Sequence, residues 1–155
     1  IKTKFPVLFN ITDVANTRFR DVFRLGLFLP LPNPLHDNGP RILYVNGSLP
    51  EMYSLEEAMT VSYVLQDIFM LEDDYAVVNG LIAINDLKSL TLSHVFQLTP
   101  VVLKKLVIYS HESMPLRMKA IHNINAPKIY DTVYQIFLPM MPQKQQNRVR
   151  ERNSR

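Results

Sequence analysis

The chain has 155 residues, with a hydrophobic share of 47% and a charged share of 20%, which is the composition of one globular domain and not of a disordered segment. It contains no cysteine, which excludes disulfides, thiolate nucleophiles and cysteine zinc sites. No apolar run reaches the roughly 18 to 20 residues that a membrane-spanning helix needs. The formal net charge of +3 is uneven, because the segment from Met141 onwards carries five basic residues and one acidic residue. Such local basicity favours a local anionic contact over a surface that coats nucleic acid.

The N-terminal part of the chain, residues 1–38, shows little hydrophobic periodicity. Within it, Leu29–Gly39 (LPLPNPLHDNG) is predicted to be a loop, because each proline lacks a backbone donor and disfavours helix in the residue before it. Arg41–Val45 (RILYV) follows and is predicted to be a short apolar strand.

Two further elements are predicted in the middle of the chain. Ser54 and Glu57 have the spacing of a capping box, and the broad apolar face that follows them predicts a helix to about Glu72. After a turn, Leu81–Ile84 (LIAI) forms an apolar run without alternation. Such a run suits a strand that is buried on both faces of a parallel sheet.

The C-terminal half continues the alternation of helices and strands. Thr99 and Pro100 are predicted to cap and start a helix, Arg117–Ile124 is predicted to be the next strand, and Pro127 is predicted to open another helix. Short connections between alternating strands and helices imply right-handed crossovers and a largely parallel, covered sheet. The predicted fold class is therefore α/β.

The sequence offers no catalytic constellation. The four histidines lack a metal-ligand spacing, and no nucleophile elbow, glycine-rich phosphate loop or zinc-protease motif is present. Asp86 follows the buried strand, where α/β enzymes often place a catalytic carboxylate, but no base or nucleophile stands in a partner role. We interpret Asp86 as a structural carboxylate that caps the following turn. An α/β enzyme that uses Asp86 or His122 is the minor alternative.

The segment after Pro127 is apolar around most of its circumference. A helix of this kind is either covered on nearly all sides within a core or able to lie against a membrane. The residues alone leave both alternatives open. One apolar stripe consists of Ile129, Val133, Ile136 and Phe137, and a second stripe beside it consists of Tyr130, Tyr134, Leu138 and Met141.

Four ordered segments carry a resemblance to a known family: LPLPNPLHDNGPRI in the first loop, GLIAINDL (Gly80–Leu87), HVFQLTPVVLKKL (His94–Leu106) and MPLRMKAIHNINAP (Met114–Pro127). Together they resemble the CRAL-TRIO lipid-binding family, and within it the alpha-tocopherol transfer protein-like members. The resemblance covers roughly Phe5 to Val149. It implies a CRAL-TRIO lipid-binding fold, in which a mixed, largely parallel sheet is flanked by helices and a gate helix lies over a hydrophobic cavity.

The resemblance also implies the function: binding and intracellular transfer of a small hydrophobic lipid that is tocopherol-, retinoid- or phospholipid-like, without enzyme activity or cofactor. Residues Pro127–Met141 fall where the gate helix lies, with one face on the cavity and the other able to enter the membrane interface. Asn85 is polar where the family member is aromatic, which argues against a tocopherol-shaped pocket. The expected lipid-pocket positions are Leu81, Ala83, Asn85, Tyr109, Ser110, Leu116 and Ile121, together with Ile129, Val133, Ile136 and Phe137 of the gate.

A basic cleft beside the gate binds phosphoinositide head groups in the resembled protein, through two basic residues before the gate and two after it. The matching positions here, which we call the basic quartet, are Arg117, Lys119, Lys144 and Arg148. A spacing of two on a strand and of four on a helix predicts that each pair shares one face. Unrelated surface charges are the alternative. The expected partners are a hydrophobic lipid and, transiently, a phosphoinositide-containing membrane, with no nucleic acid, for a cytoplasmic monomer.

The resemblance further implies a division of the chain. Residues 1–9 are expected to be a remnant of an N-terminal helical domain, 10–149 a CRAL-TRIO lipid-binding domain that lacks its C-terminal end, and 150–155 a divergent basic tail. The family continues after this point into a final strand, which we expect to be missing, so that a sheet edge or cavity wall stays uncovered. A truncated non-binding fragment or an adaptor is therefore an alternative to the lipid carrier.

Overall fold

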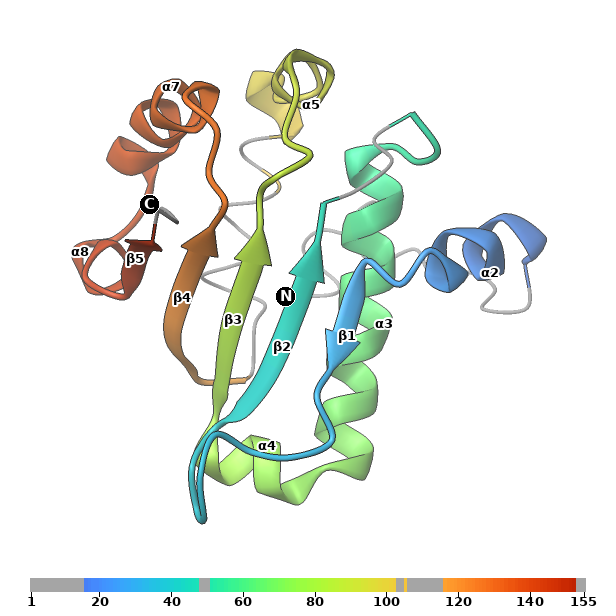
Figure 1. Cartoon of the computed structure of the whole chain (residues 1–155). Coiled ribbons are helices and arrows are strands. Elements are labelled where there is room, and N and C mark those ends of the chain that lie inside the picture. The colour runs from blue at the N-terminus through green and yellow to red at the C-terminus, as the bar shows by residue number, and fades with distance from the viewer. Residues whose placement is uncertain (1–15, 48–50, 103–104, 106–115, 153–155) are drawn as a thin grey trace.

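A computed structural model describes residues 16–47, 51–102, 105 and 116–152. Within these residues the strands form one sheet in the order β1-β2-β3-β4-β5 (Figure 1). Strands β2 to β5 run parallel, and β1 at the edge is antiparallel to β2. The prediction of an α/β fold with a mixed, largely parallel sheet is therefore confirmed. The strands are β1 (Phe28–Pro30), β2 (Arg41–Asn46), β3 (Leu81–Asp86), β4 (Met118–Ile124) and β5 (Val149–Arg152).

Helices lie on one face of the sheet and beyond its carboxyl end, and shorter ones lie at its amino end and beside its edge strands (Figure 1). The longest described helix, α3, packs on the sheet, whereas α5 and α7 lie beyond the carboxyl ends of β3 and β4 (Figure 1). The described helices are α2 (Thr17–Arg24), α3 (Leu55–Glu72), α4 (Asp74–Asn79), α5 (Leu92–Phe96), α7 (Ile129–Phe137) and α8 (Gln143–Gln146), with a 3-10 turn η2 (Leu138–Met140).

The predicted capping box starts α3. The backbone N–H of Glu57 donates to Ser54 Oγ at 3.2 Å, and the backbone N–H of Ser54 donates to Glu57 Oε2 at 2.7 Å. The helix ends at Glu72, as the apolar pattern predicted. Two of the four backbone donors left open at the start of a helix are thus satisfied locally.

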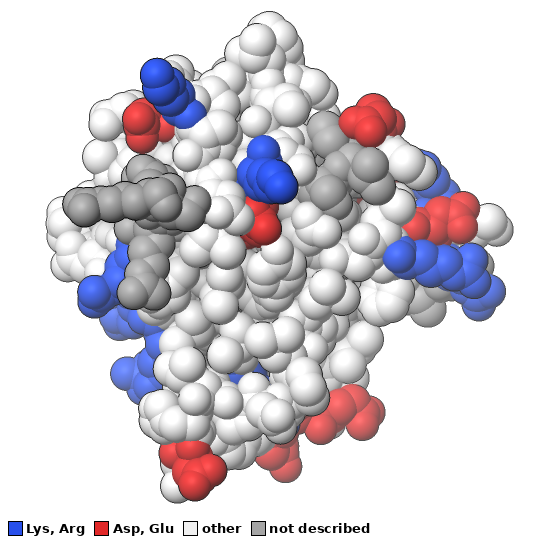
Figure 2. Space-filling model, viewed as in Figure 1, with Lys and Arg blue, Asp and Glu red and all other residues white. Residues whose placement is uncertain are grey.

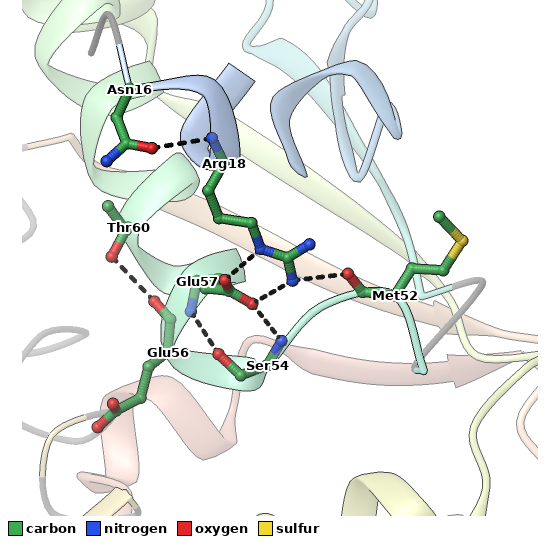
Figure 3. A network of polar contacts seen from close by, with 7 residues as sticks. All are labelled: Asn16, Arg18, Met52, Ser54, Glu56, Glu57 and Thr60. Atoms are coloured by element: carbon green, nitrogen blue, oxygen red, sulfur yellow. Dashed lines mark hydrogen bonds and ion pairs between the residues drawn. The ribbon is translucent and has the colours of Figure 1, made fainter. Parts of the chain in front are cut away.

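The same glutamate fixes α2 against the start of α3 (Figure 3). Arg18 donates from Nε to Glu57 Oε1 at 2.6 Å and from Nη2 to Glu57 Oε2 at 2.9 Å. The Nη2 group also donates to the backbone carbonyl of Met52 at 2.8 Å. The guanidinium hydrogen bonds lower the pKa of Glu57 to about 2, against the opposing effect of burial.

The sheet face that α3 covers is set by strand alternation and register. Side chains of paired residues in parallel strands point to the same side, so Leu43 of β2 shares this face with Leu81 and Ala83 of β3. Leu65 and Phe69 of α3 pack on these strands, and Leu81 is fully buried. This half of the face is a filled hydrophobic core.

Two N-terminal elements were not predicted. Helix α2 begins after Asn16, whose Oδ1 accepts from the backbone N–H of Arg18 at 2.8 Å. Strand β1 covers Leu29 and Pro30, so the prediction that the loop starts at Leu29 is wrong by two residues. A proline is tolerated there because β1 is an edge strand, and the next ladder donor is the backbone N–H of Leu31, which donates to the Ile42 carbonyl at 2.9 Å.

The last strand was also predicted incorrectly. Residues Val149–Arg152 form β5, which pairs in parallel with β4. The expectation that no strand follows Val149 is therefore wrong, and residues 150–152, which we expected to belong to a divergent tail, take part in the sheet. Charged side chains did not prevent pairing because the ladder uses backbone groups, and edge strands commonly carry charge.

Candidate functional site

A pocket of about 430 Å³ opens at the carboxyl ends of β2 and β3, on the same face as the filled core. It lies between the first turns of α3, the segment around α5 and one side of α7. Its size falls in the range of small-molecule sites. The apolar lining residues are Leu27, Phe28, Val45, Tyr53, Leu55, Ala58, Leu87, Leu90, Leu98, Val133 and Phe137.

Helix α7 forms one wall of this pocket. Val133 and Phe137 line it, as expected for two members of the first apolar stripe. Ile129 and Ile136 of that stripe do not line it, and Ile136 is 42% exposed. The helix is shorter than the predicted segment, because it ends at Phe137 and continues as the 3-10 turn η2. Proline at position 139 has no N–H to donate and therefore suits a change of helix type at this point.

A chain of hydrogen bonds ties α7 to the sheet beneath the pocket. Asn85, which lines the pocket, donates from Nδ2 to Asn123 Oδ1 at 2.9 Å. Asn123 of β4 donates from Nδ2 to the Tyr130 hydroxyl at 2.6 Å. Asn123 is 5% exposed and Tyr130 is 8% exposed, so these polar groups are shielded from water. We call Asn85, Asn123 and Tyr130 the polar chain.

Asp86 lies among the pocket's lining residues, and both of its carboxylate oxygens accept hydrogen bonds. Its Oδ1 accepts from Asn125 Nδ2 at 3.0 Å and from the backbone N–H of Lys88 at 3.1 Å, and its Oδ2 accepts from the Tyr44 hydroxyl at 2.7 Å. The hydrogen bonds from Asn125 and Tyr44 lower the pKa of Asp86. The interpretation of Asp86 as a carboxylate that caps the following turn is confirmed. A general acid or base at neutral pH needs the opposite shift.

Two further polar lining residues, Gln97 and His94, accept hydrogen bonds from backbone N–H groups. Gln97 Oε1 accepts from the backbone N–H of Leu55 at 2.8 Å, which joins the end of α5 to the start of α3. His94 Nδ1 accepts from the backbone N–H of Thr91 at 3.1 Å, and burial lowers the pKa of His94. A neutral imidazole with Nδ1 as the acceptor fits both observations.

The other expected lining positions lie elsewhere. Leu81, Ala83 and Leu116 are buried, and Leu81 and Leu116 belong to the filled core. Ile121 is half-buried in β4 and is not part of this pocket. Tyr109 and Ser110 lie outside the described residues. Among the expected positions, the pocket thus brings together Asn85, Val133 and Phe137.

Several lining and supporting residues were not predicted. Asn123 lies within Met114–Pro127, which carried the resemblance, but it received no role. His94 and Gln97 lie within the segment HVFQLTP, which carried the resemblance but received no role. The start of α3 was predictable, yet its position beside the pocket depends on how the helix packs.

The basic quartet lies along β4, β5 and α8. The Arg117 carbonyl accepts from the backbone N–H of Leu81 at 3.0 Å, and the Arg148 carbonyl accepts from that of Ile121 at 2.9 Å, so both arginines flank the sheet. Arg117, Lys119 and Lys144 are exposed, and Arg148 is half-buried. Figure 2 shows basic side chains gathered at the edge of the molecule where Figure 1 places β4, β5 and α8.

The start of β4 does not keep the regular alternation that would place Arg117 and Lys119 on one face. Leu81 pairs with Met118 and Ile82 pairs with Ala120, so Lys119 is the extra residue of a bulge. A bulge breaks the alternation, and the spacing of two no longer places Arg117 and Lys119 on one face. None of the four quartet side chains forms an ion pair with a described acidic residue.

Neither a membrane-spanning helix nor a metal-binding cluster occurs in the described residues. No helix in the described ranges is long and apolar enough to cross a membrane. Three or more histidine, aspartate or glutamate residues do not come together in that part of the chain in a way that could hold a metal ion.

Comparisons with known proteins agree on a family. The model of the CRAL/TRIO domain matches residues 35–154. The chain is 24% identical to alpha-tocopherol transfer protein-like of Homo sapiens over 149 residues. This aligned region covers 95% of this chain and 42% of that protein. The chain is also 30% identical to clavesin-2 of Rattus norvegicus over 80 residues. This shorter aligned region covers 52% of this chain and 24% of that protein. The chain therefore spans less than half the length of these relatives.

A solved structure shares the fold. The crystal structure of Sfh5 superposes with a TM-score of 0.60 at 12% sequence identity, over 97% of this chain and 54% of that one. At this identity the likeness concerns the fold alone.

Proposed function

Because the chain belongs to the CRAL/TRIO domain family, we propose that it binds a small hydrophobic lipid and transfers it within the cell, with phosphoinositide-assisted docking on membranes. The observation that carries this proposal is the largely apolar pocket at the carboxyl end of the sheet, with α7 as one wall. Burial of apolar area stabilises such a complex by about 25 cal/mol per Å² without any covalent step. The ligand is tocopherol-, retinoid- or phospholipid-like.

The basic quartet supports the membrane part of the proposal. Three of its four side chains are exposed, and none is neutralised by a described acidic residue, so they are free to meet anionic head groups. Each basic residue near an anionic leaflet contributes about 1 kcal/mol, and Arg117 and Arg148 can engage phosphate bidentately. The carrier would act as a cytoplasmic monomer that associates with membranes transiently.

Direct binding tests the main proposal. Delipidated, refolded protein is titrated with fluorescent tocopherol, retinoid and phospholipid probes, and circular dichroism checks that it is folded. We expect saturable binding of at least one probe that the unlabelled lipid reverses. A folded protein that binds none of them in a competable way would contradict the carrier and favour the adaptor or non-binding fragment.

An enzyme that uses Asp86 is the weaker candidate. The carboxylate is engaged by three donors and its pKa is lowered, whereas a general acid or base requires free access to a substrate proton. His122 belongs to β4, where it pairs with Ile84 of β3 and Arg150 of β5. These observations favour binding without chemistry.

A further inference from the structure

The polar lining groups of the pocket differ in the hydrogen-bonding capacity that they still offer. Both oxygens of Asp86, Oε1 of Gln97 and Nδ1 of His94 already accept hydrogen bonds from described donors. Asn46, which also lines the pocket, already interacts with another group of the protein. Asn85 uses one N–H for the bond to Asn123, and its carbonyl oxygen has no partner among the described residues. Asn85 thus offers an unoccupied carbonyl oxygen beside a spare N–H, whereas the carbonyl oxygen of Gln97 already accepts from the backbone.

A hydroxyl group is the chemical complement of this spare capacity. A hydroxyl both donates and accepts, so it can donate to Asn85 Oδ1 and accept the second N–H of the same amide. An ether oxygen can only accept. A carboxylate also only accepts, and it would bring a second negative charge to a pocket whose rim holds Asp86. The described lining contains no lysine or arginine to compensate for that charge, and Lys88 is exposed outside it.

We infer that the polar end of the pocket is a head-group subsite for one uncharged hydroxyl, with Asn85 as the contact residue, so that the ligand is a lipid alcohol. This inference rests on the proposed lipid binding and names the ligand class for it. The hydrocarbon part lies along Val45, Leu98 and the α7 residues Val133 and Phe137. Because Asn85 also belongs to the polar chain, a hydroxyl bound there contacts the same hydrogen-bonded network that ends at Tyr130 on α7.

Three ligands with one hydrocarbon chain separate the possibilities. The affinities of hexadecanol, hexadecyl methyl ether and hexadecanoic acid are measured by displacement of Nile red from the wild-type protein. We expect the alcohol to bind about three- to tenfold more tightly than the ether, which is the contribution of one net hydrogen bond. The acid is expected to bind more weakly than the ether.

The variant Asn85→Leu keeps the side-chain size and removes both hydrogen-bonding groups. We expect it to reduce the ratio of alcohol to ether affinity to about one. The control Val45→Ala, which changes the residue that pairs with Asn85 across the strands, is expected to weaken alcohol and ether alike and to preserve their ratio. Because the readout is a ratio within one protein, a loss of stability that affects both ligands cancels.

Each outcome decides between the proposals. Equal binding of alcohol and ether by the wild type, an unchanged ratio in Asn85→Leu, or tightest binding of the acid overturns the subsite while lipid binding stands. If none of the three ligands displaces Nile red from folded protein, the subsite is overturned, and the titration with tocopherol, retinoid and phospholipid probes decides separately on the proposed function.

Discussion

The two ends of one sheet face behave differently. At the amino end of β3, Leu81 is fully buried under Leu65 and Phe69 of α3. At the carboxyl end of the same strand, Asn85 projects from the same face but lines a pocket of about 430 Å³. Strand alternation determines which side chains share a face, and the packing of α3 determines whether that face meets side chains or space. The filled end therefore supports stability, and the open end is available for a ligand.

The largest effect on stability is expected at the filled end. Leu81→Ala should lower the free energy of unfolding by about 2–5 kcal/mol, because the lost side chain leaves a cavity in a packed core. Leu98→Ala is the matched change at the open end, where a half-buried leucine already borders the pocket. Leu98→Ala should lower the free energy of unfolding by less than half as much as Leu81→Ala. Urea denaturation of the lipid-free proteins measures both, and equal costs would remove the distinction between the two ends.

The second-largest effect on stability is expected when the polar chain is broken. Asn123→Ala removes the acceptor of Asn85 and the donor to Tyr130 in a buried place, which should cost about 1–3 kcal/mol. Exchange of the amide hydrogens of α7 should also become faster, since the helix loses a bond to the sheet. Asn147→Ala, an exposed asparagine after α8, is the control and should leave unfolding and exchange almost unchanged. If the amide hydrogens of α7 exchange in Asn123→Ala as slowly as in the wild type, the polar chain does not hold that helix to the sheet.

A smaller, pH-dependent effect is expected where α2 meets the start of α3. Glu57 has a pKa lowered to about 2 from its ordinary value near 4.5, so its contribution to stability is complete above pH 4.5 and is lost as the pH falls toward 2. Glu57→Gln should remove this part of the acid dependence, because the amide does not titrate. Thermal unfolding between pH 2 and 7 measures it. Glu72→Gln in the last turn of α3 is the control, and identical acid profiles for both variants would contradict the assignment.

The smallest effect on stability is expected at the basic edge. The double reversal Arg117→Glu and Arg148→Glu should change the free energy of unfolding by only about 0.5 kcal/mol. Binding to phosphoinositide-containing vesicles should nevertheless fall steeply, and high salt should reproduce the loss in the wild type. Vesicle sedimentation measures this. Reversal of Arg20 and Arg24 on α2 is the matched control with the same change of charge.

The double reversal also separates the basic edge from the pocket. Binding of the apolar probe in solution should change little, because none of the quartet residues lines the pocket. Loss of lipid binding with intact vesicle association would mean that the quartet has a structural role and that its assignment to head groups is wrong.

The candidate site was predictable only in part. The resemblance singled out Asn85, and the apolar stripe singled out Val133 and Phe137, all of which line the pocket. The same reasoning expected Leu81 and Leu116 beside the ligand, yet they lie in the filled core. Periodicity reports that a side chain faces inward, and it does not distinguish a core position from a cavity position. Asn123 was not predicted as a site residue, because its role depends on hydrogen bonds to Asn85 and Tyr130, which only the tertiary structure places beside it.

The sequence by itself determined the local elements with strong chemical signals. The capping box of Ser54 and Glu57 and the apolar run after Gly80 placed α3 and β3, because caps and buried strands depend on neighbouring residues. Only the tertiary structure decided the edges and the site. Strands β1 and β5 form by pairing with a neighbour in spite of proline or charge, and the bulge at Lys119 follows from the register between β3 and β4. The pocket exists because α3, α5 and α7 meet at one end of the sheet, and no short segment of the sequence encodes how far apart these helices lie.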